Sequence, residues 1–181
     1  MIVLSLFLVP LIGGLLSFFM KNDRTVRLWT LFISLVSLFL SVAGNFFLKS
    51  NDNLAFSTQW MGNLGSSFSL KLDGLSQILT LLTAVAYPII LLSTWKTNYR
   101  KPNNFFALLL LTQAGLMGVF TATDALLFYF FWELALIPVY FLCSGWGGER
   151  RIPVTFKFFI YTFAGSVLML VGLIIQRILL R

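Results

Sequence analysis

Long apolar segments alternate with short polar ones along the chain. Each apolar segment has about 20 residues, the length that a helix needs to cross the hydrocarbon core of a bilayer. Alternating apolar and polar strands of the outer-membrane type are absent from the sequence. The pattern therefore predicts an all-α integral membrane protein with six transmembrane helices, at residues 2–20, 28–48, 75–95, 104–122, 125–145 and 154–175.

Composition strengthens this interpretation and removes several classes of chemistry. The chain is 59% hydrophobic and 10% charged, whereas soluble domains carry about 25% charged residues. The basic residues form no face or run that would follow a phosphate backbone, so we expect no nucleic-acid partner. One cysteine and no histidine leave no disulfide within the chain and no cluster for a metal. Segment 2–20 lacks a preceding basic region and a small-residue cleavage site, so it is interpreted as a retained span.

Basic residues in the short connections predict the orientation in the membrane. Eight lie after the first, third and fifth segments, and four lie on the other side. Because cytoplasmic loops carry the excess of Lys and Arg, the N-terminus is expected outside. The first set is Lys21, Arg24, Arg27, Lys96, Arg100, Lys101, Arg150 and Arg151, and the second is Lys49, Lys71, Arg177 and Arg181.

Residues 49–74 form the longest stretch outside the predicted spans. This stretch is rich in Ser, Asn and Gly, which predicts a small external hairpin or an irregular lid. Asp73 precedes Gly74 and is expected to cap the third helix in a turn. Pro88 within that helix leaves one carbonyl without its helical donor and should kink the span.

Glu133 is the candidate functional residue. It lies nine residues after Asp124, roughly 13 Å along a helix and therefore close to the middle of the bilayer. An isolated carboxylate there resists ionisation, and a nearby cation favours its charged form. A carboxylate whose charge is switched by a movable cation can relay protons. The alternative is a structural hydrogen bond to a neighbouring helix, which is rarer at this depth.

Several neighbours in the sequence could assist Glu133. Pro138 frees the carbonyl of Leu134, which suits either a hydrated half-channel or a packing kink. Tyr129 shares the helix face of Glu133 and could hold its carboxylate, whereas Trp132 is interpreted as packing. Lys157 lies about one turn inside the last span, where it could relay protons or extend to the membrane interface.

Other polar and small residues in the spans are interpreted as structural. Thr112 and Gln113 are expected to bridge neighbouring helices, and 164–166, Ala-Gly-Ser, to allow close approach of another helix. Cys143 is expected to be a small apolar filler. The sequence shows no phosphate-binding loop, no paired catalytic carboxylates and no nucleophile–base pair.

Two stretches carry a resemblance to a known family: DALLFYFFWELALIPVYFLCSGWGGERRIPVTFKFFIYTFAGSVLMLVG at 124–172 and LDGLS at 72–76. They resemble the M-type antiporter-like membrane subunit of respiratory complex I, the proton-pumping NADH:quinone oxidoreductase. Multisubunit sodium/proton antiporter subunits share a looser version. The GGERR and KFFIYT motifs favour the complex I branch.

The resemblance implies a fold and a role for Glu133. Family members have about fourteen spans in two inverted repeats, so the chain would be the first part of a longer antiporter-like bundle. Residues 1–103 would hold helices one to three with the external loop 49–74, and residues 104–181 the start of the proton-translocation repeat. Glu133 takes the place of the family's central proton-transfer glutamate, whose lysine partner in the seventh helix would lie beyond Arg181.

The resemblance also implies a location and partners. The chain would be a subunit of complex I in the bacterial inner membrane, which is favoured over a mitochondrial or plastid one. Its partners would be other membrane-arm subunits and membrane lipids. No cofactor is expected in this chain, because flavin, iron–sulfur clusters and quinone would belong to partner subunits. A sodium/proton antiporter subunit and a truncated, non-pumping scaffold fragment are the alternatives.

Overall fold

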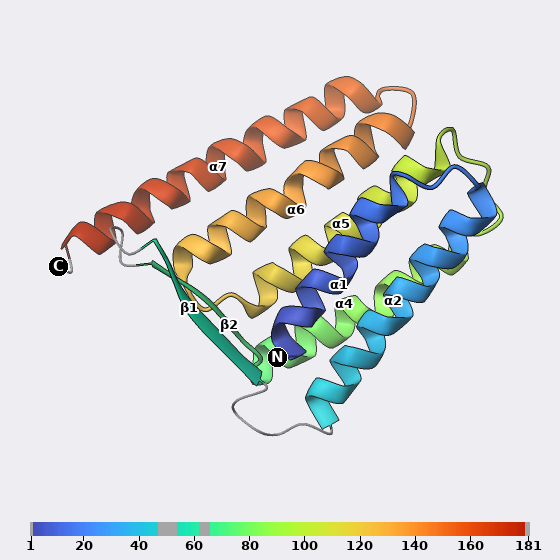
Figure 1. The fold of residues 1–181 in the computed structure, drawn as a ribbon. Helices are drawn as coiled ribbons and strands as arrows, with labels where there is room; N and C mark the ends of the chain where they lie inside the picture. Colours follow the sequence, from blue (N-terminus) through green and yellow to red (C-terminus); the bar gives the residue numbers. More distant parts are fainter. Residues whose placement is uncertain (1, 47–53, 62–65, 180–181) are drawn as a thin grey trace.

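The computed structural model describes residues 2–46, 54–61 and 66–179, and within them it is mostly helical (Figure 1). Six helices and one two-stranded sheet make up the described part of the chain. The helices pack side by side as one bundle, and the sheet lies between α2 and α4 in the sequence. The helices are α1 (Ile2–Ser17), α2 (Asp23–Phe46), α4 (Gly74–Ser93), α5 (Pro102–Thr121), α6 (Ala125–Trp146) and α7 (Arg151–Leu179), and the strands are β1 (Ala55–Met61) and β2 (Ser66–Lys71).

The six helices confirm the predicted class of fold. Five of them, α2, α4, α5, α6 and α7, are long and apolar enough to cross a membrane. Helix α1 is the exception to the predicted set of six spans, since its 16 residues cover only about 24 Å. It ends at Ser17, three residues before the predicted end of the apolar segment.

Helix α5 lies at the centre of the bundle, in contact with α1, α2, α4 and α6. Helix α7 lies at one edge and packs on α6 (Figure 1). The connections after α1, α4 and α6 lie at one end of the bundle, and the β1–β2 hairpin lies at the other. This agrees with the three basic connections sharing one side of the membrane.

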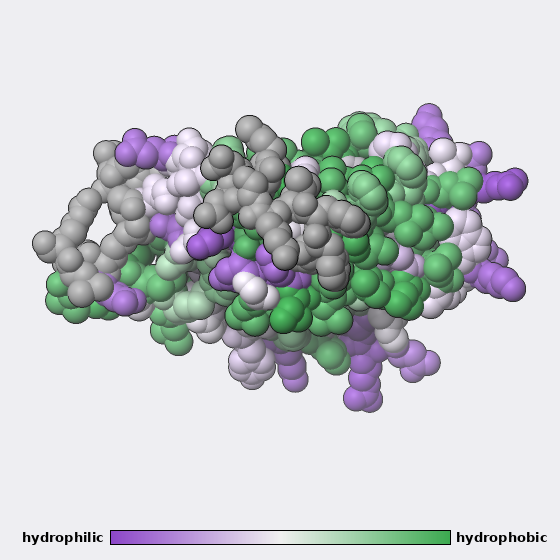
Figure 2. Space-filling model, turned by 90° about the horizontal axis from the view of Figure 1, so that it is seen from below, coloured by the Kyte–Doolittle hydropathy of each residue, from purple (hydrophilic) through white to green (hydrophobic). Residues whose placement is uncertain are grey.

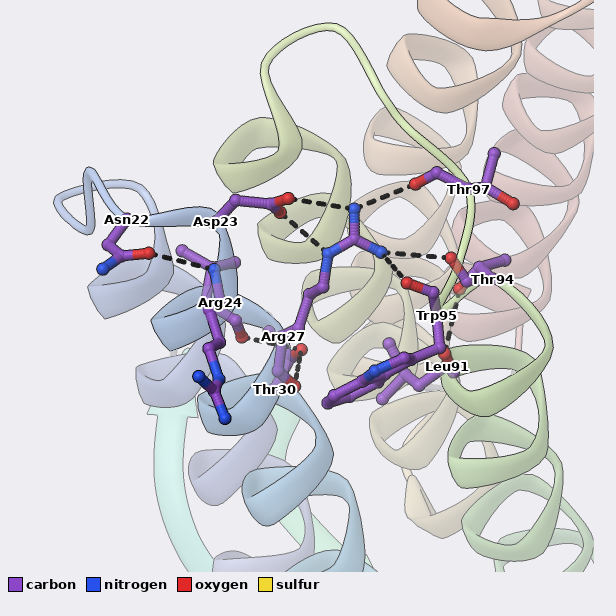
Figure 3. A network of polar contacts seen from close by, with 10 residues as sticks. Asn22, Asp23, Arg24, Arg27, Thr30, Leu91, Thr94, Trp95 and Thr97 are labelled. Carbon is purple, nitrogen blue, oxygen red and sulfur yellow. Dashed lines mark hydrogen bonds and ion pairs between the residues drawn. The ribbon is translucent and has the colours of Figure 1, made fainter.

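Helix α2 begins five residues earlier than predicted, because Arg27 is part of the helix rather than of a loop (Figure 3). Arg27 is buried, with 6% of the residue exposed. The guanidinium donates to Asp23 Oδ1 at 2.8 Å, to the carbonyls of Thr94 and Thr97 at 3.3 and 2.9 Å, and to the carbonyl of Trp95. A cation near the C-terminal carbonyls of a helix is stabilising, so Arg27 fastens α2 to the end of α4.

A hairpin was expected in residues 49–74, and the structure shows one, although residues 47–53 and 62–65 lie outside the described part. Strands β1 and β2 pair antiparallel, with Ala55 opposite Lys71. Strand β2 also meets the segment before α6, where Leu70 pairs with Ala122 and the Thr123 N–H donates to the Ser69 carbonyl at 3.0 Å. The hairpin is thereby attached to the start of α6.

Asp73 immediately precedes α4, the third predicted span, and Pro88 lies within it. Asp73 is the N-cap residue, and its carboxylate accepts the Ser76 N–H at 2.8 Å. This hydrogen bond lowers the pKa of the Asp73 carboxyl below its ordinary value, because it stabilises the charged form. Pro88 lies inside α4 and is buried.

Candidate functional site

The N-terminus of α6 is held by Asp124. Its carboxylate Oδ1 accepts the N–H groups of Leu126 and Leu127 at 2.9 and 3.2 Å, so it caps the helix. The Ser66 hydroxyl, on β2, donates to the same oxygen at 2.7 Å. One carboxylate therefore joins the hairpin to the first turn of α6.

Aromatic rings continue this attachment into the next turn of α6. Trp60 on β1 meets Phe130 edge-on at 5.6 Å between ring centroids. Phe131, fully buried, meets Phe68 of β2 at 6.2 Å and Phe7 of α1 at 4.8 Å. Edge-to-face pairs of this kind add about 0.5–1.5 kcal/mol each beyond their buried area. The two residues that precede Trp132 and Glu133 are thus fixed from three directions.

Two glycines let α5 and α6 approach closely on either side of Glu133. A Cβ atom on Gly115 would lie 2.7 Å from the Ala135 Cα, and one on Gly118 would lie 2.3 Å from the Phe131 ring. Both distances are shorter than any van der Waals contact, so the two positions require glycine. They fix α6 two residues before and two residues after Glu133.

The side chain of Glu133, on α6, lies at the contact between α6 and α7. Its side chain is half-buried rather than fully enclosed. Its Oε1 accepts a hydrogen bond from the hydroxyl of Ser166, a residue of α7 that is 5% exposed. The sequence singled out residues 164–166 for close helix approach, but it did not identify Ser166 as the partner of the carboxylate. The signal for this partner in the sequence was a serine within a run of small residues on the following helix.

The Ser166 hydroxyl has a second acceptor within reach, the carbonyl of Phe163 at 2.9 Å. A hydroxyl carries one proton and two acceptor lone pairs. With Glu133 ionised, the hydroxyl can donate to the carboxylate. With Glu133 protonated, the carboxyl can donate to the Ser166 oxygen while the hydroxyl donates to Phe163. The arrangement therefore offers Glu133 a hydrogen bond in both protonation states.

In the described part of the chain, Glu133 makes no hydrogen bond or ion pair with Lys157 or Tyr129. Lys157 is exposed, and it lies nine residues before Ser166, half a turn from it around α7. Tyr129 is half-buried one turn before Glu133, but the hydrogen bond to the carboxylate comes from Ser166. The structure brings Glu133 and Ser166 together and leaves Lys157 on the opposite face of α7.

Three other expectations from the sequence are wrong in detail. Thr112 does not bridge two helices, because its hydroxyl donates to the Leu108 carbonyl of its own helix at 2.8 Å. Gln113 is buried in α5 and reaches no hydrogen-bond partner among the described residues. Cys143 is exposed rather than an interior filler. Pro138, by contrast, is buried in α6 five residues after Glu133.

The outer faces of α6 and α7 are hydrophobic and exposed. Only 6% of the most apolar part of α7 is buried, and large apolar side chains cover it, among them Ile152, Phe156, Leu168 and Ile175. The face seen from below in Figure 2 also carries much hydrophobic surface, with hydrophilic residues at its right and lower margins and beside the grey segments. Such a surface suits lipid or further apolar helices rather than water.

These features define a polytopic helical membrane protein with a carboxylate held between two spanning helices. Residues 122–177, which contain Glu133 and Ser166, match the family described as NADH:quinone oxidoreductase/Mrp antiporter, transmembrane. The chain is homologous to F(420)H(2) dehydrogenase subunit M and to NAD(P)H-quinone oxidoreductase chain 4.

The relatives align with nearly all of this chain but are much longer. The F(420)H(2) dehydrogenase subunit M of Methanosarcina mazei is 40% identical over 93% of this chain and 34% of its own length. The NAD(P)H-quinone oxidoreductase chain 4 3 of Picosynechococcus is 38% identical over 93% of this chain and 30% of its own. The chain thus spans about a third of the length of the curated relatives it matches.

A solved structure has the same arrangement of helices. A chain of respiratory complex I from Thermus thermophilus with bound NADH superimposes with a TM-score of 0.82 and 29% identity, over 94% of this chain and 34% of that one. The membrane-bound sulfane sulfur reductase, an archaeal respiratory membrane complex, gives a TM-score of 0.76 at 23% identity. The second likeness concerns the fold alone.

Proposed function

We propose that this chain acts as a proton-translocating membrane subunit of an NADH:quinone oxidoreductase of the complex I type, in which Glu133 carries the proton. The observation that supports this most is the Glu133–Ser166 hydrogen bond between α6 and α7. It lies inside the region that matches the transmembrane family. Flavin, iron–sulfur clusters and quinone would lie in partner subunits, together with the redox chemistry.

The hydrogen-bond geometry supports a carrier rather than a fixed structural charge. One salt bridge is found among the described residues, and it joins Arg27 and Asp23. Glu133 therefore has no ion pair in this part of the chain. An unpaired carboxylate at mid-bilayer depth is costly when charged. It would load a proton when no cation is near and release it when a cation approaches. Ser166 would stabilise both forms.

The cation would come from outside the described helices. Lys157 lies on the opposite face of α7 from Ser166, and Glu133 is partly open. The exposed apolar faces of α6 and α7 leave room for further helices of a longer bundle. A lysine on such a helix would approach Glu133 from its open side and switch its charge.

Replacing Ser166 tests the role of the hydroxyl. We expect Ser166→Ala to lower proton transfer about tenfold, because a hydrogen bond to a charged group contributes about 1.5–3 kcal/mol. Ser166→Thr, which keeps a hydroxyl at the same carbon, should retain most of the activity. Proton uptake would be measured in vesicles that hold the assembled complex. Equal rates for the alanine and threonine variants would exclude a role for the hydroxyl.

We further propose that the chain lies in the bacterial inner membrane with its N-terminus outside. Arg100 and Arg150 belong to the connections after α4 and α6, which lie at the same end of the bundle. There the Trp146 indole donates to the Arg100 carbonyl at 3.0 Å.

Cysteine labelling tests this orientation. In a Cys143→Ser background, an impermeant thiol reagent applied from the cytoplasmic side should label cysteines placed at Arg100 and Arg150. It should leave a cysteine at Asn53 unlabelled, because that position belongs to the opposite side of the membrane. Asn53 itself lies outside the described residues. The reverse pattern of labelling would contradict the proposed orientation.

A further inference from the structure

Gln113 is a buried polar side chain that the proposed proton path does not use. Its exposed fraction is 0%. Neither Oε1 nor Nε2 of its amide has a hydrogen-bond partner among the described residues. A buried amide without partners costs roughly 1–3 kcal/mol in proteins. The helix that carries it, α5, contacts α1, α2, α4 and α6.

The position of Gln113 on α5 shows which helices it faces. Phe106, Leu110 and Met117 lie seven and three residues before it and four residues after it, so all four share one helix face. Phe106 belongs to a buried cluster with Val26 of α2 and Leu91 of α4. Gln113 therefore points into the interface of α2, α4 and α5, about 10 Å along α5 from that cluster.

The helices that meet α5 there carry buried hydroxyl groups. Thr30 and Ser37 lie four and eleven residues after Val26, on its face of α2, and both are fully buried. Thr80 lies eleven residues before Leu91, on its face of α4, and is also fully buried. By helical rise, Gln113 lies between the levels of Thr30 and Ser37.

Each of these hydroxyls donates its hydrogen bond to a backbone carbonyl of its own helix. Thr30 donates to the Val26 carbonyl at 3.0 Å, Ser37 to the Ile33 carbonyl at 3.0 Å and Thr80 to the Ser76 carbonyl at 2.7 Å. Their oxygens remain able to accept hydrogen bonds, but they have no donor left for the Gln113 carbonyl. Among the described residues no donor reaches Oε1, and a water molecule would supply one.

We propose that Gln113 binds an ordered water molecule in the interface of α2, α4 and α5. A water molecule donates and accepts, so it can serve Oε1 and Nε2 and still donate to a hydroxyl oxygen, which gives it the two to four partners that internal waters have. The site is separate from Glu133. Gly115, which contacts α6, lies nearly half a turn around α5 from Gln113.

A density map of the full chain in its assembled complex, at a resolution that shows internal waters, tests the proposal directly. We expect a water peak at about 3 Å from both Oε1 and Nε2 of Gln113. A map that resolves waters elsewhere in the interior and shows none at this amide would overturn the proposal.

The sign of a stability change provides a second test. If Gln113 holds a water molecule, Gln113→Leu removes both protein ligands of that water and should lower the Tm by about 2–4 °C. If the amide had no partner, the same change would relieve a buried unsatisfied group and raise the Tm, which would overturn the proposal. Met117→Leu is the matched control, because it conserves volume at a fully buried site one turn away on the same face. A Gln113→Leu chain that fails to fold would leave the density map as the deciding measurement.

Discussion

Replacing Glu133 with glutamine should reduce proton transfer by about 100-fold or more while the chain still folds. The change keeps the shape of the side chain and its hydrogen bond with Ser166 but removes the group that gains and loses a proton. Glu133→Asp should be milder, since it keeps the acid and withdraws it by one methylene. The measurement is proton uptake into vesicles containing the assembled complex, energised by its electron donor.

Glu149→Gln provides the matched control for this experiment. It makes the same chemical change at the other glutamate of the chain, which is exposed in the turn between α6 and α7. It should leave proton transfer close to the level of the unmodified protein. Normal transfer in an assembled Glu133→Gln complex would exclude Glu133 as the carrier, whatever the family resemblance.

Adding one methyl group at Gly115 should have the largest effect on stability. The new Cβ would lie 2.7 Å from the Cα and Cβ of Ala135 and 2.9 Å from its backbone nitrogen. A backbone cannot rotate away as a long side chain does, so α6 must shift relative to α5. Overpacking of this kind costs about 1–3 kcal/mol, and we expect Gly115→Ala to lower the Tm by about 4–8 °C. Thermal unfolding of the purified protein is the measurement.

The same substitution should also reduce proton transfer, because Ala135 lies two residues after Glu133 and the shift would alter the distance from Glu133 to Ser166. Gly145→Ala is the control, since Gly145 is in the last turn of α6 and its Cβ would meet nothing within 4 Å. Alanine favours helix more than glycine does, so the control should keep or slightly raise the Tm. A tolerated alanine at Gly115 would mean that α5 and α6 are not held at this contact.

The number and approximate bounds of the helices follow from the sequence because hydropathy and length dominate the cost of crossing a bilayer. The predicted segment at 125–145 and the helix Ala125–Trp146 agree to within one residue. Glu133 was also accessible from the sequence, since a carboxylate within a long apolar run is a rare and expensive feature. Asp73 could be assigned to a helix start for a similarly local reason, as capping depends on neighbouring residues alone.

The start of α2 shows where local patterns fail. The hydropathy pattern places the end of the first polar connection at Arg27, because it treats every charged side chain as exposed to water. The carbonyls of Thr94, Trp95 and Thr97 are distant in the sequence but close in the fold, and they make the charge of Arg27 compatible with burial in a helix. A partner that lies about seventy residues away cannot be read from a window of twenty.

The candidate site at Glu133 was determined partly by the sequence and partly by the tertiary structure. The sequence determined that an ionisable group stands in a membrane-spanning helix. The packing of α7 on α6 decided that its partner is Ser166 and that Lys157 lies on the far face, since a rotation of α7 by half a turn would exchange the two. Helix rotation depends on the sum of many side-chain contacts, and no single residue along the chain encodes it.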